Sequence, residues 1–256
     1  MAQQIYAMSD IHGYLDAFDA ALAKVPLTQS DVMLLIMGDL IDGGPQSCQV
    51  LTRVKALCAE YPEKVHFLIG NHDVMFLDLL ASGDRDWLAH DQKLITTQSF
   101  LDEAEWRQLV ADLRTQPWRI VELIQAAIIG AQPELIRWLD NQRGQLFYET
   151  ATQIFVHAGV DESMGDYWRG GTDRETFYWK YPATTGKFGK MIIAGHVGSA
   201  EVAHDTAYLG HIYWDGASHI FIDGTVKQSG VVPVLHYDGV TGRYGEVGDK
   251  GEEELR

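Results

Sequence analysis

One recurring unit restricts the fold of this chain more than any other feature: a short apolar run followed by a polar turn rich in Gly, Asp, His or Asn. The unit occurs five times, with apolar runs at residues 4–8, 32–37, 65–69, 154–156 and 191–194. Continuous apolar runs of this length are typical of strands covered on both faces, as in a mainly parallel sheet under helices. Helical patterns follow the first three runs, at about 15–25, 46–60 and 74–80. Alternating strands and helices predict an α/β fold.

The five polar turns are expected to meet, because loops at the carboxyl ends of such strands form the ligand crevice. The candidate metal ligands in these turns are Asp10, His12, Asp39, Asn71, His157 and His196. Carboxylate, amide and imidazole donors suit Mn²⁺, Fe²⁺ or Zn²⁺. Six ligands exceed the needs of one tetrahedral ion, whereas two ions that share a bridging carboxylate would use all six. A pair of ions clamps the attacking and leaving oxygens in phosphoryl displacement.

The charge of the chain restricts its partners. It has 36 acidic residues and 20 Lys and Arg, which gives a formal net charge of −16. This balance argues against binding to long nucleic acids and to anionic membrane surfaces. A phosphate-bearing substrate would therefore need a local source of positive charge, and two divalent ions would supply one.

Residues from about 81 to 144 differ from the rest of the chain. They have helical patterns at 101–113, 117–130 and 133–141, which we interpret as a helical insertion beside the sheet that roofs the crevice. Their aromatic side chains are expected to belong to the core rather than to a ligand platform; they include Trp87, Trp106, Trp118 and Trp138.

After residue 196 the pattern changes to short strands. A hairpin is expected within 212–222 and another strand at 231–235, whereas the acidic tail at 245–256 is expected to fray. No linker divides the chain, so residues 1–256 are interpreted as a single domain. The histidines outside the turns have no partner at metal-binding spacing and are expected to be surface or loop residues: His90, His204, His211, His219 and His236.

No apolar stretch is long enough for a signal segment or a membrane span. Only Cys48 and Cys58 are present, which is too few for a disulfide framework. We therefore expect a soluble, cytoplasmic protein. The sequence leaves its oligomeric state open.

Taken together, the motifs resemble those of the calcineurin-like metallophosphoesterases, and within them the bacterial enzymes of the phosphoprotein phosphatase and diadenosine-tetraphosphatase type. The matching segments are Asp10-Ile11-His12-Gly13, Gly38-Asp39-Leu40-Ile41-Asp42-Gly43-Gly44, Gly70-Asn71-His72-Asp73, His157-Ala158-Gly159 and Gly195-His196. The resemblance covers residues 10–196 and is loose for the insertion and the C-terminal strands. It implies a four-layer α/β/β/α sandwich with a binuclear metal centre.

The resemblance also implies a role for each turn residue. Asp10 and His12 would hold the first ion, Asp39 would bridge, and Asn71, His157 and His196 would complete the second site. The general acid of the family falls on His72 and its partner on Asp42, and a nearby carboxylate would restore an imidazolium that two cations disfavour. The nucleophile would be a metal-bound hydroxide. Among the candidate ions we favour Mn²⁺.

The chain departs from the family at positions that grip phosphate. It has Gly43 and Ile69 where the phosphatases usually carry Arg, so it lacks two bidentate phosphate contacts. Arg169, in a loop shortly after His157, is the candidate substrate contact. Gly195-His196-Val197-Gly198 also lacks the second His of the family, so the first ion would rely on water for its remaining positions.

We therefore expect a metal-dependent hydrolase of phosphate mono- or diesters that acts on a phosphorylated small molecule, a nucleotide polyphosphate or a phosphoprotein. The missing arginines disfavour a Ser/Thr or Tyr phosphoprotein phosphatase relative to a bis(5′-nucleosyl)-tetraphosphate hydrolase. A non-catalytic metal-binding scaffold is a further alternative, although none of the six ligands is missing. A nuclease would be restricted to short substrates by the negative charge.

Overall fold

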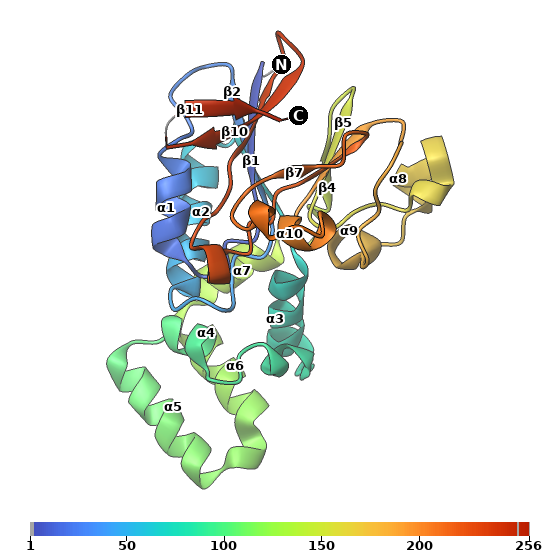
Figure 1. Ribbon diagram of the computed structural model, residues 1–256. Helices are drawn as coiled ribbons and strands as arrows, with labels where there is room; N and C mark the ends of the chain where they lie inside the picture. The colour runs from blue at the N-terminus through green and yellow to red at the C-terminus, as the bar shows by residue number, and fades with distance from the viewer. Residues whose placement is uncertain (1–2, 250, 256) are drawn as a thin grey trace.

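The computed structural model describes residues 3–249 and 251–255, and two β-sheets form its centre (Figure 1). The first sheet has the strand order β11-β10-β9-β1-β2-β3 and the second β4-β5-β6-β8-β7. The first contains β1 (Gln4–Met8), β2 (Val32–Met37), β3 (Val65–Leu68), β9 (Leu235–Asp238), β10 (Arg243–Gly248) and β11 (Gly251–Glu254). The second contains β4 (Phe147–Glu149), β5 (Gln153–Val156), β6 (Met191–Ala194), β7 (Tyr213–Trp214) and β8 (His219–Phe221).

The strands that precede the five polar turns are parallel within their sheets. β1 pairs in parallel with β2, and β2 with β3. In the second sheet β5 pairs in parallel with β6, and β6 with β8. The carboxyl ends of neighbouring parallel strands lie at one edge of a sheet, so each set of turns leaves its sheet together.

The two sheets pack face to face, and helices cover their outer faces. In β1, Ile5 and Ala7 lie in the core between the sheets, whereas Tyr6 and Met8 lie in the core under the helices. Both faces are therefore buried, which is why the strand is a continuous apolar run rather than an alternating one. The helices on the first sheet include α1 (Leu15–Leu22) and α2 (Ser47–Glu60), and those on the second include α8 (Trp168–Gly171) and α9 (Thr176–Trp179). The four-layer α/β/β/α sandwich is confirmed.

The segment interpreted as an insertion is helical, but its longest helices do not roof the crevice. It begins at the end of α3 (Asn71–Ser82) and contains η1 (Asp86–Ala89), α4 (Ile95–Ser99), α5 (Glu103–Thr115), η2 (Pro117–Arg119), α6 (Ile120–Ala131) and α7 (Pro133–Asp140). α5 and α6 form an antiparallel pair that extends away from both sheets (Figure 1). Trp87 is fully buried, as expected, whereas Trp118 is 71% exposed at the turn between these helices, so the core interpretation is wrong for Trp118.

The C-terminal region differs from the expectation in three ways. The last central strand begins at Leu235 rather than 231, since Pro233 has no N–H to give to a sheet ladder. The acidic tail pairs as the antiparallel strands β10 and β11 on β9 instead of fraying. His219 and His236 lie buried in strands, not at the surface.

Short helices complete the chain: η3 (Glu162–Tyr167), α10 (Ser199–Val202), η4 (Thr206–Tyr208) and α11 (Val226–Ser229). The expected hairpin is present, because β7 pairs antiparallel with β8. Among the described residues, no helix combines the length and the apolar character that a bilayer crossing requires.

Candidate metal centre

The turns after β1, β2 and β6 hold their polar residues in an unusual backbone conformation. Asp10, His12, Asp39 and His196 have φ angles of 55°, 49°, 54° and 65°. Left-handed conformations of non-glycine residues cost about 1–3 kcal/mol each and persist only where the surroundings enforce them. Cross-turn hydrogen bonds do so here, such as that from the His12 N–H to the Asp39 carbonyl at 2.9 Å. The backbone of these turns therefore directs the four side chains toward one point.

Glycines before the ligands let the turns approach one another. A Cβ atom at Gly70 would collide with the carboxylate of Asp39, and one at Gly195 would collide with the carboxylate of Asp10. The Gly-Asn and Gly-His pairs of the sequence motifs are thus needed for close contact between turns that belong to different strands.

Asp39 lies at the centre of the converging side chains. Its Oδ2 is 3.7 Å from His12 Nε2 and 3.9 Å from His72 Nε2, and its Oδ1 is 3.4 Å from His157 Nε2. It belongs to two groups with metal-binding geometry, one with His12 and His72 and one with His157 and His196. Burial by itself would raise the pKa of Asp39, but the surrounding imidazoles, His157 foremost, hold it below its usual range. A carboxylate shared by two groups is suited to bridging two cations.

Asp10 and His12 lie on one side of Asp39. His12 Nδ1 donates to the carbonyl of Ile41 at 2.9 Å, which turns Nε2 toward the two carboxylates. Nε2 is 3.9 Å from Asp10 Oδ1. Burial, together with the charges of Asp223 and Asp39, raises the pKa of Asp10 well above its usual value. A cation between these groups would relieve the repulsion among the carboxylates.

On the other side of Asp39, three side chains turn ligand atoms toward one another: Asn71, His157 and His196. His157 Nδ1 donates to the carbonyl of Met37 at 2.7 Å, so its Nε2 is an acceptor. Asn71 Oδ1 lies 3.0 Å from that Nε2, 3.0 Å from His196 Nδ1 and 3.3 Å from Asp39 Oδ2. If the amide is turned instead, its NH₂ group donates to these acceptors. A cation satisfies all four acceptors at once, so the residues fit a metal ion.

His72 is bonded to Asp42, as the sequence analysis expected for an acid and its partner. His72 Nδ1 donates to Asp42 Oδ2 at 2.7 Å. Burial by itself would lower the pKa of His72, but the charge of Asp39 and the bond to Asp42 raise it to about 9. Asp42 also accepts from Trp87 Nε1 at 2.9 Å and from Thr96 Oγ1 at 2.8 Å. The helical insertion therefore supplies two of the groups that fix this carboxylate.

The sequence analysis missed the role of Asp73, which joins two turns. Its Oδ2 accepts from the backbone N–H of Asp39 at 3.0 Å and of Gly70 at 3.1 Å, and its Oδ1 accepts from the N–H of Leu40 at 3.1 Å. The residue is completely buried. Its place in the Gly-Asn-His-Asp motif was a usable signal, because an acidic residue in the first turn of a helix often accepts backbone N–H groups.

We expect Asp73→Ala to lower the free energy of unfolding by at least about 3 kcal/mol, because it leaves three buried N–H groups unpaired at about 1–3 kcal/mol each. Urea unfolding followed by circular dichroism measures this change. Asp78→Ala on the same helix is the matched control, since the Asp78 side chain is half-exposed and pairs with the guanidinium of Arg143. Equal losses in the two variants would contradict the role given to Asp73.

Arg169 is engaged elsewhere in the structure. It pairs with Glu149 of the edge strand β4 and lies over the ring of Phe147, 5.6 Å from its centroid. None of its described contacts reaches the six converging residues, and its role as a substrate contact stays a prediction.

A hollow of about 270 Å³ adjoins the converging residues and contains groups that the sequence analysis did not single out. Its lining includes His12, Asp42 and His72 and also His90, Asp223 and Lys227. Asp223 follows β8, so a sixth strand with a polar turn reaches the same edge. The run at 219–222 carried this signal, but the sequence analysis assigned it only to a hairpin.

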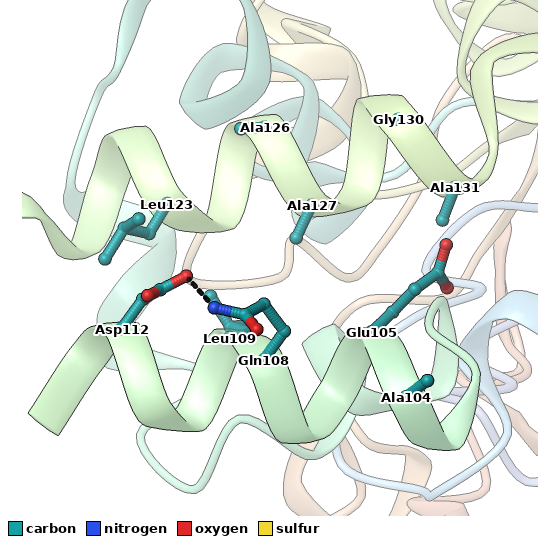
Figure 2. Close-up of a pocket in the computed structure, with 10 residues that line it drawn as sticks. All are labelled: Ala104, Glu105, Gln108, Leu109, Asp112, Leu123, Ala126, Ala127, Gly130 and Ala131. Carbon is teal, nitrogen blue, oxygen red and sulfur yellow. Dashed lines mark hydrogen bonds between the residues drawn. The ribbon is translucent and has the colours of Figure 1, made fainter.

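A larger hollow of about 520 Å³ lies between α5 and α6 (Figure 2). Small residues of α6, among them Ala126, Ala127 and Gly130, face α5 across it. On the α5 side, Gln108 donates to Asp112 at 3.0 Å (Figure 2). None of the predicted site residues lines this hollow, so it is separate from the candidate metal centre.

Comparison with known proteins agrees with this arrangement. The model of the calcineurin-like phosphoesterase family matches residues 4–198. Among curated relatives, the symmetrical bis(5′-nucleosyl)-tetraphosphatase of Delftia acidovorans (strain DSM 14801 / SPH-1) is 35% identical, over 44% of this chain and 37% of that protein. That of Legionella pneumophila (strain Lens) is 36% identical, over 35% of this chain and 30% of that protein. The chain thus spans about a third of the length of these relatives.

Solved structures share the fold. The cold-active protein-tyrosine phosphatase of a psychrophile, Shewanella sp., has a TM-score of 0.61 at 16% identity, over 100% of this chain and 81% of that chain. A metallophosphoesterase from Sphaerobacter thermophilus has a TM-score of 0.50 at 15% identity, over 100% of this chain and 89% of that chain. At these identities the likeness concerns the fold alone.

Proposed function

Because the chain belongs to the calcineurin-like phosphoesterase family, we propose that it hydrolyses phosphate esters and cleaves their P–O bonds with two divalent ions that share Asp39. The observation that carries this proposal is the convergence of two groups of possible metal-ligand atoms on one buried carboxylate, that of Asp39. Ordinary folded proteins avoid buried acceptors that face one another without a donor. A pair of cations is the simplest partner for such a set.

In the proposed site, Asp10 and His12 would hold one ion with Asp39. The other ion would be held by Asp39 with Asn71, His157 and His196. The mixed oxygen and nitrogen donors favour Mn²⁺, Fe²⁺ or Zn²⁺ over Mg²⁺ or Ca²⁺, and we propose Mn²⁺. When bound, the ions supply positive charge for the phosphoryl oxygens and lower the pKa of a coordinated water.

His72 would hold a proton for the leaving oxygen. Its Nδ1 is committed to Asp42, so Nε2 is the atom that carries a proton toward Asp39 and the substrate. Trp87 and Thr96 keep Asp42 in place and thereby fix the orientation of the imidazole ring. A positioned proton donor contributes roughly 10²- to 10⁴-fold to the rate.

We propose a nucleotide polyphosphate as the substrate. The curated relatives are named symmetrical bis(5′-nucleosyl)-tetraphosphatases, which favours this class, whereas the protein-tyrosine phosphatase shares only the fold. The absence of arginine at Gly43 and Ile69 also supports it, because a phosphoprotein phosphatase of this family would be expected to use both.

A substrate panel tests the proposal. The enzyme loaded with Mn²⁺ is assayed against diadenosine tetraphosphate, p-nitrophenyl phosphate, and Ser, Thr and Tyr phosphopeptides. We expect kcat/KM for the dinucleotide to exceed that for the phosphopeptides by at least about tenfold, a difference of about 1.4 kcal/mol in transition-state binding. A preference for phosphopeptides would overturn the substrate class. No turnover of any phosphoester with Mn²⁺, Fe²⁺ or Zn²⁺ would overturn the function itself.

We propose the cytoplasm as the place of action. Cys48 and Cys58 are both free. They lie ten residues apart on α2, about 15 Å along the helix axis, which is too far for a disulfide. Burial raises the pKa of the Cys58 thiol to about 11, so this thiol is unreactive at neutral pH. Thiols of this kind support a reducing compartment.

A further inference from the structure

Two adjoining hollows, together called the groove below, lie between the candidate metal centre and the helical insertion. The hollow of about 270 Å³ beside His12 and His72 shares part of its lining with a second hollow of about 390 Å³. The shared residues are Gly43, His90 and Lys227. Together the two hollows have the size of a small-molecule site, which is typically about 300–1,000 Å³.

Gly43 lines both hollows and has no side chain to fill the space between them. A Cβ atom built on Gly43 would be in ordinary van der Waals contact with His12 and Tyr14, at 3.7 Å. A glycine at this position therefore leaves more room between the hollows than a residue with a side chain would.

Two lysines line the groove beside three aspartates, in a chain whose net charge is −16. Lys227 lines both hollows and Lys93 lines the outer one, and both side chains are exposed. Within residues 3–249 and 251–255, neither lysine has a carboxylate partner, whereas Lys24, Lys180 and Lys190 each have one. Both ammonium groups are therefore free to bind an anion.

The acidic residue of the outer hollow does not cancel this charge. Asp91 is buried, and its carboxylate is directed to the start of α4. Its Oδ1 accepts from the N–H of Thr96 at 2.9 Å, and its Oδ2 accepts from the N–H of Thr97 at 2.9 Å and from Thr97 Oγ1 at 2.6 Å. These donors, at a helix N-terminus, offset its charge locally.

The segment that carries Lys227 is anchored to the core. Val226, the preceding residue, is buried, and the Thr225 N–H donates to Asp223 Oδ1 at 2.7 Å. Asp223 is itself buried and lines the hollow beside the metal centre. The backbone of Lys227 is therefore fixed beside the groove, while its side chain is free to move.

We propose that Lys227, with Lys93 farther along the groove, binds a second phosphate group of the substrate next to the one that is cleaved. The substrate class is thus a chain of at least two linked phosphates. A lysine is a compact charge on a flexible stem, which suits successive phosphates of a chain better than a fixed bidentate contact does. The proposal rests on the proposed function and adds a specificity-determining residue to it.

Lys227→Met tests the proposal, because it keeps the length of the stem and removes the charge. We expect its KM for diadenosine tetraphosphate to rise about tenfold, the effect of one charge-assisted hydrogen bond, with kcat within about twofold. The KM for p-nitrophenyl phosphate, which has one phosphate, should rise less than about threefold. Lys227→Arg should retain most of the affinity for the dinucleotide. Lys187→Met, at an exposed lysine outside both hollows, is the matched control and should change neither KM.

Two results would overturn the inference while leaving the proposed function intact. The first is an unchanged KM for the dinucleotide in Lys227→Met. The second is an equal rise for both substrates, which would place Lys227 on the cleaved phosphate. Failure of the wild-type enzyme to hydrolyse either substrate would instead overturn the proposed function.

Discussion

Asp39→Asn should lower kcat for p-nitrophenyl phosphate by at least about 10³-fold. Asp39 faces imidazoles of both groups, so its replacement weakens both proposed ion sites at once. Loss of metal stabilisation of the transition state costs several kcal/mol, and about 4 kcal/mol corresponds to roughly 10³ in rate. The measurement is steady-state turnover with Mn²⁺ in excess, with Asp16→Asn, at an exposed residue of α1, as the control.

Chelation gives a second measurement of how far turnover depends on divalent ions. The wild-type enzyme should lose turnover in a strong chelator and regain it when Mn²⁺ is returned, whereas Asp39→Asn should show no recovery. Activity of the wild-type enzyme that survives complete removal of divalent ions would contradict the metal-dependent function.

His72→Asn should slow turnover by about 10²- to 10⁴-fold while both ions remain bound. The variant removes the proposed proton donor and leaves the six proposed ligands in place. The loss should be larger for an alkyl phosphate than for p-nitrophenyl phosphate, because a poor leaving group needs protonation more. His204→Asn, at an exposed residue with a φ of 52° that Asn tolerates, is the control.

The metal content of His72→Asn separates two roles for this residue. His72 groups with His12 and Asp39 closely enough to act as a ligand. Loss of one ion from the variant would assign it that role and contradict the proposed acid. Retention of both ions together with the expected loss of turnover would support the acid, with Asp42 as its positioning residue.

The six proposed ligands could be predicted to converge because the physics that places the turns is local. Each follows a strand that is buried on both faces, and a polar residue directly after such a strand has few other reasons to be there. Parallel strands then place these turns at one edge without further information. His72 and Asp42 were found through the resemblance to a family, and the structure shows the bond between them.

The residues that support the site could not be found in this way. Trp87 and Thr96 reach Asp42 from a helical segment 45 and 54 positions away, and no periodic pattern links them to it. Lys227 reaches the groove only because Val226 anchors a four-residue helix. Contacts of this kind depend on how helices and strands pack against one another, and this packing cannot be predicted from the pattern of a single sequence.

The prediction that the C-terminal tail frays was wrong for a similar reason. The acidic composition of the tail favours fraying, yet Val247 packs against the core under the helices and Tyr244 packs against the core between the sheets. The ring of Tyr244 also lies 4.8 Å from that of Tyr237 between centroids. A few apolar side chains, here on both faces of the strand, are enough to add a strand to an existing sheet edge. Net charge therefore predicted the wrong state for a segment that has a partner strand.

The number of ions per chain tests the central claim most directly. The protein is loaded with Mn²⁺, freed of unbound metal, and measured by native mass spectrometry together with elemental analysis. Two ions per wild-type chain, and loss of both from Asp39→Asn, are the results that this account predicts. A single ion or none in the wild-type chain, or two ions retained by Asp39→Asn, would contradict it.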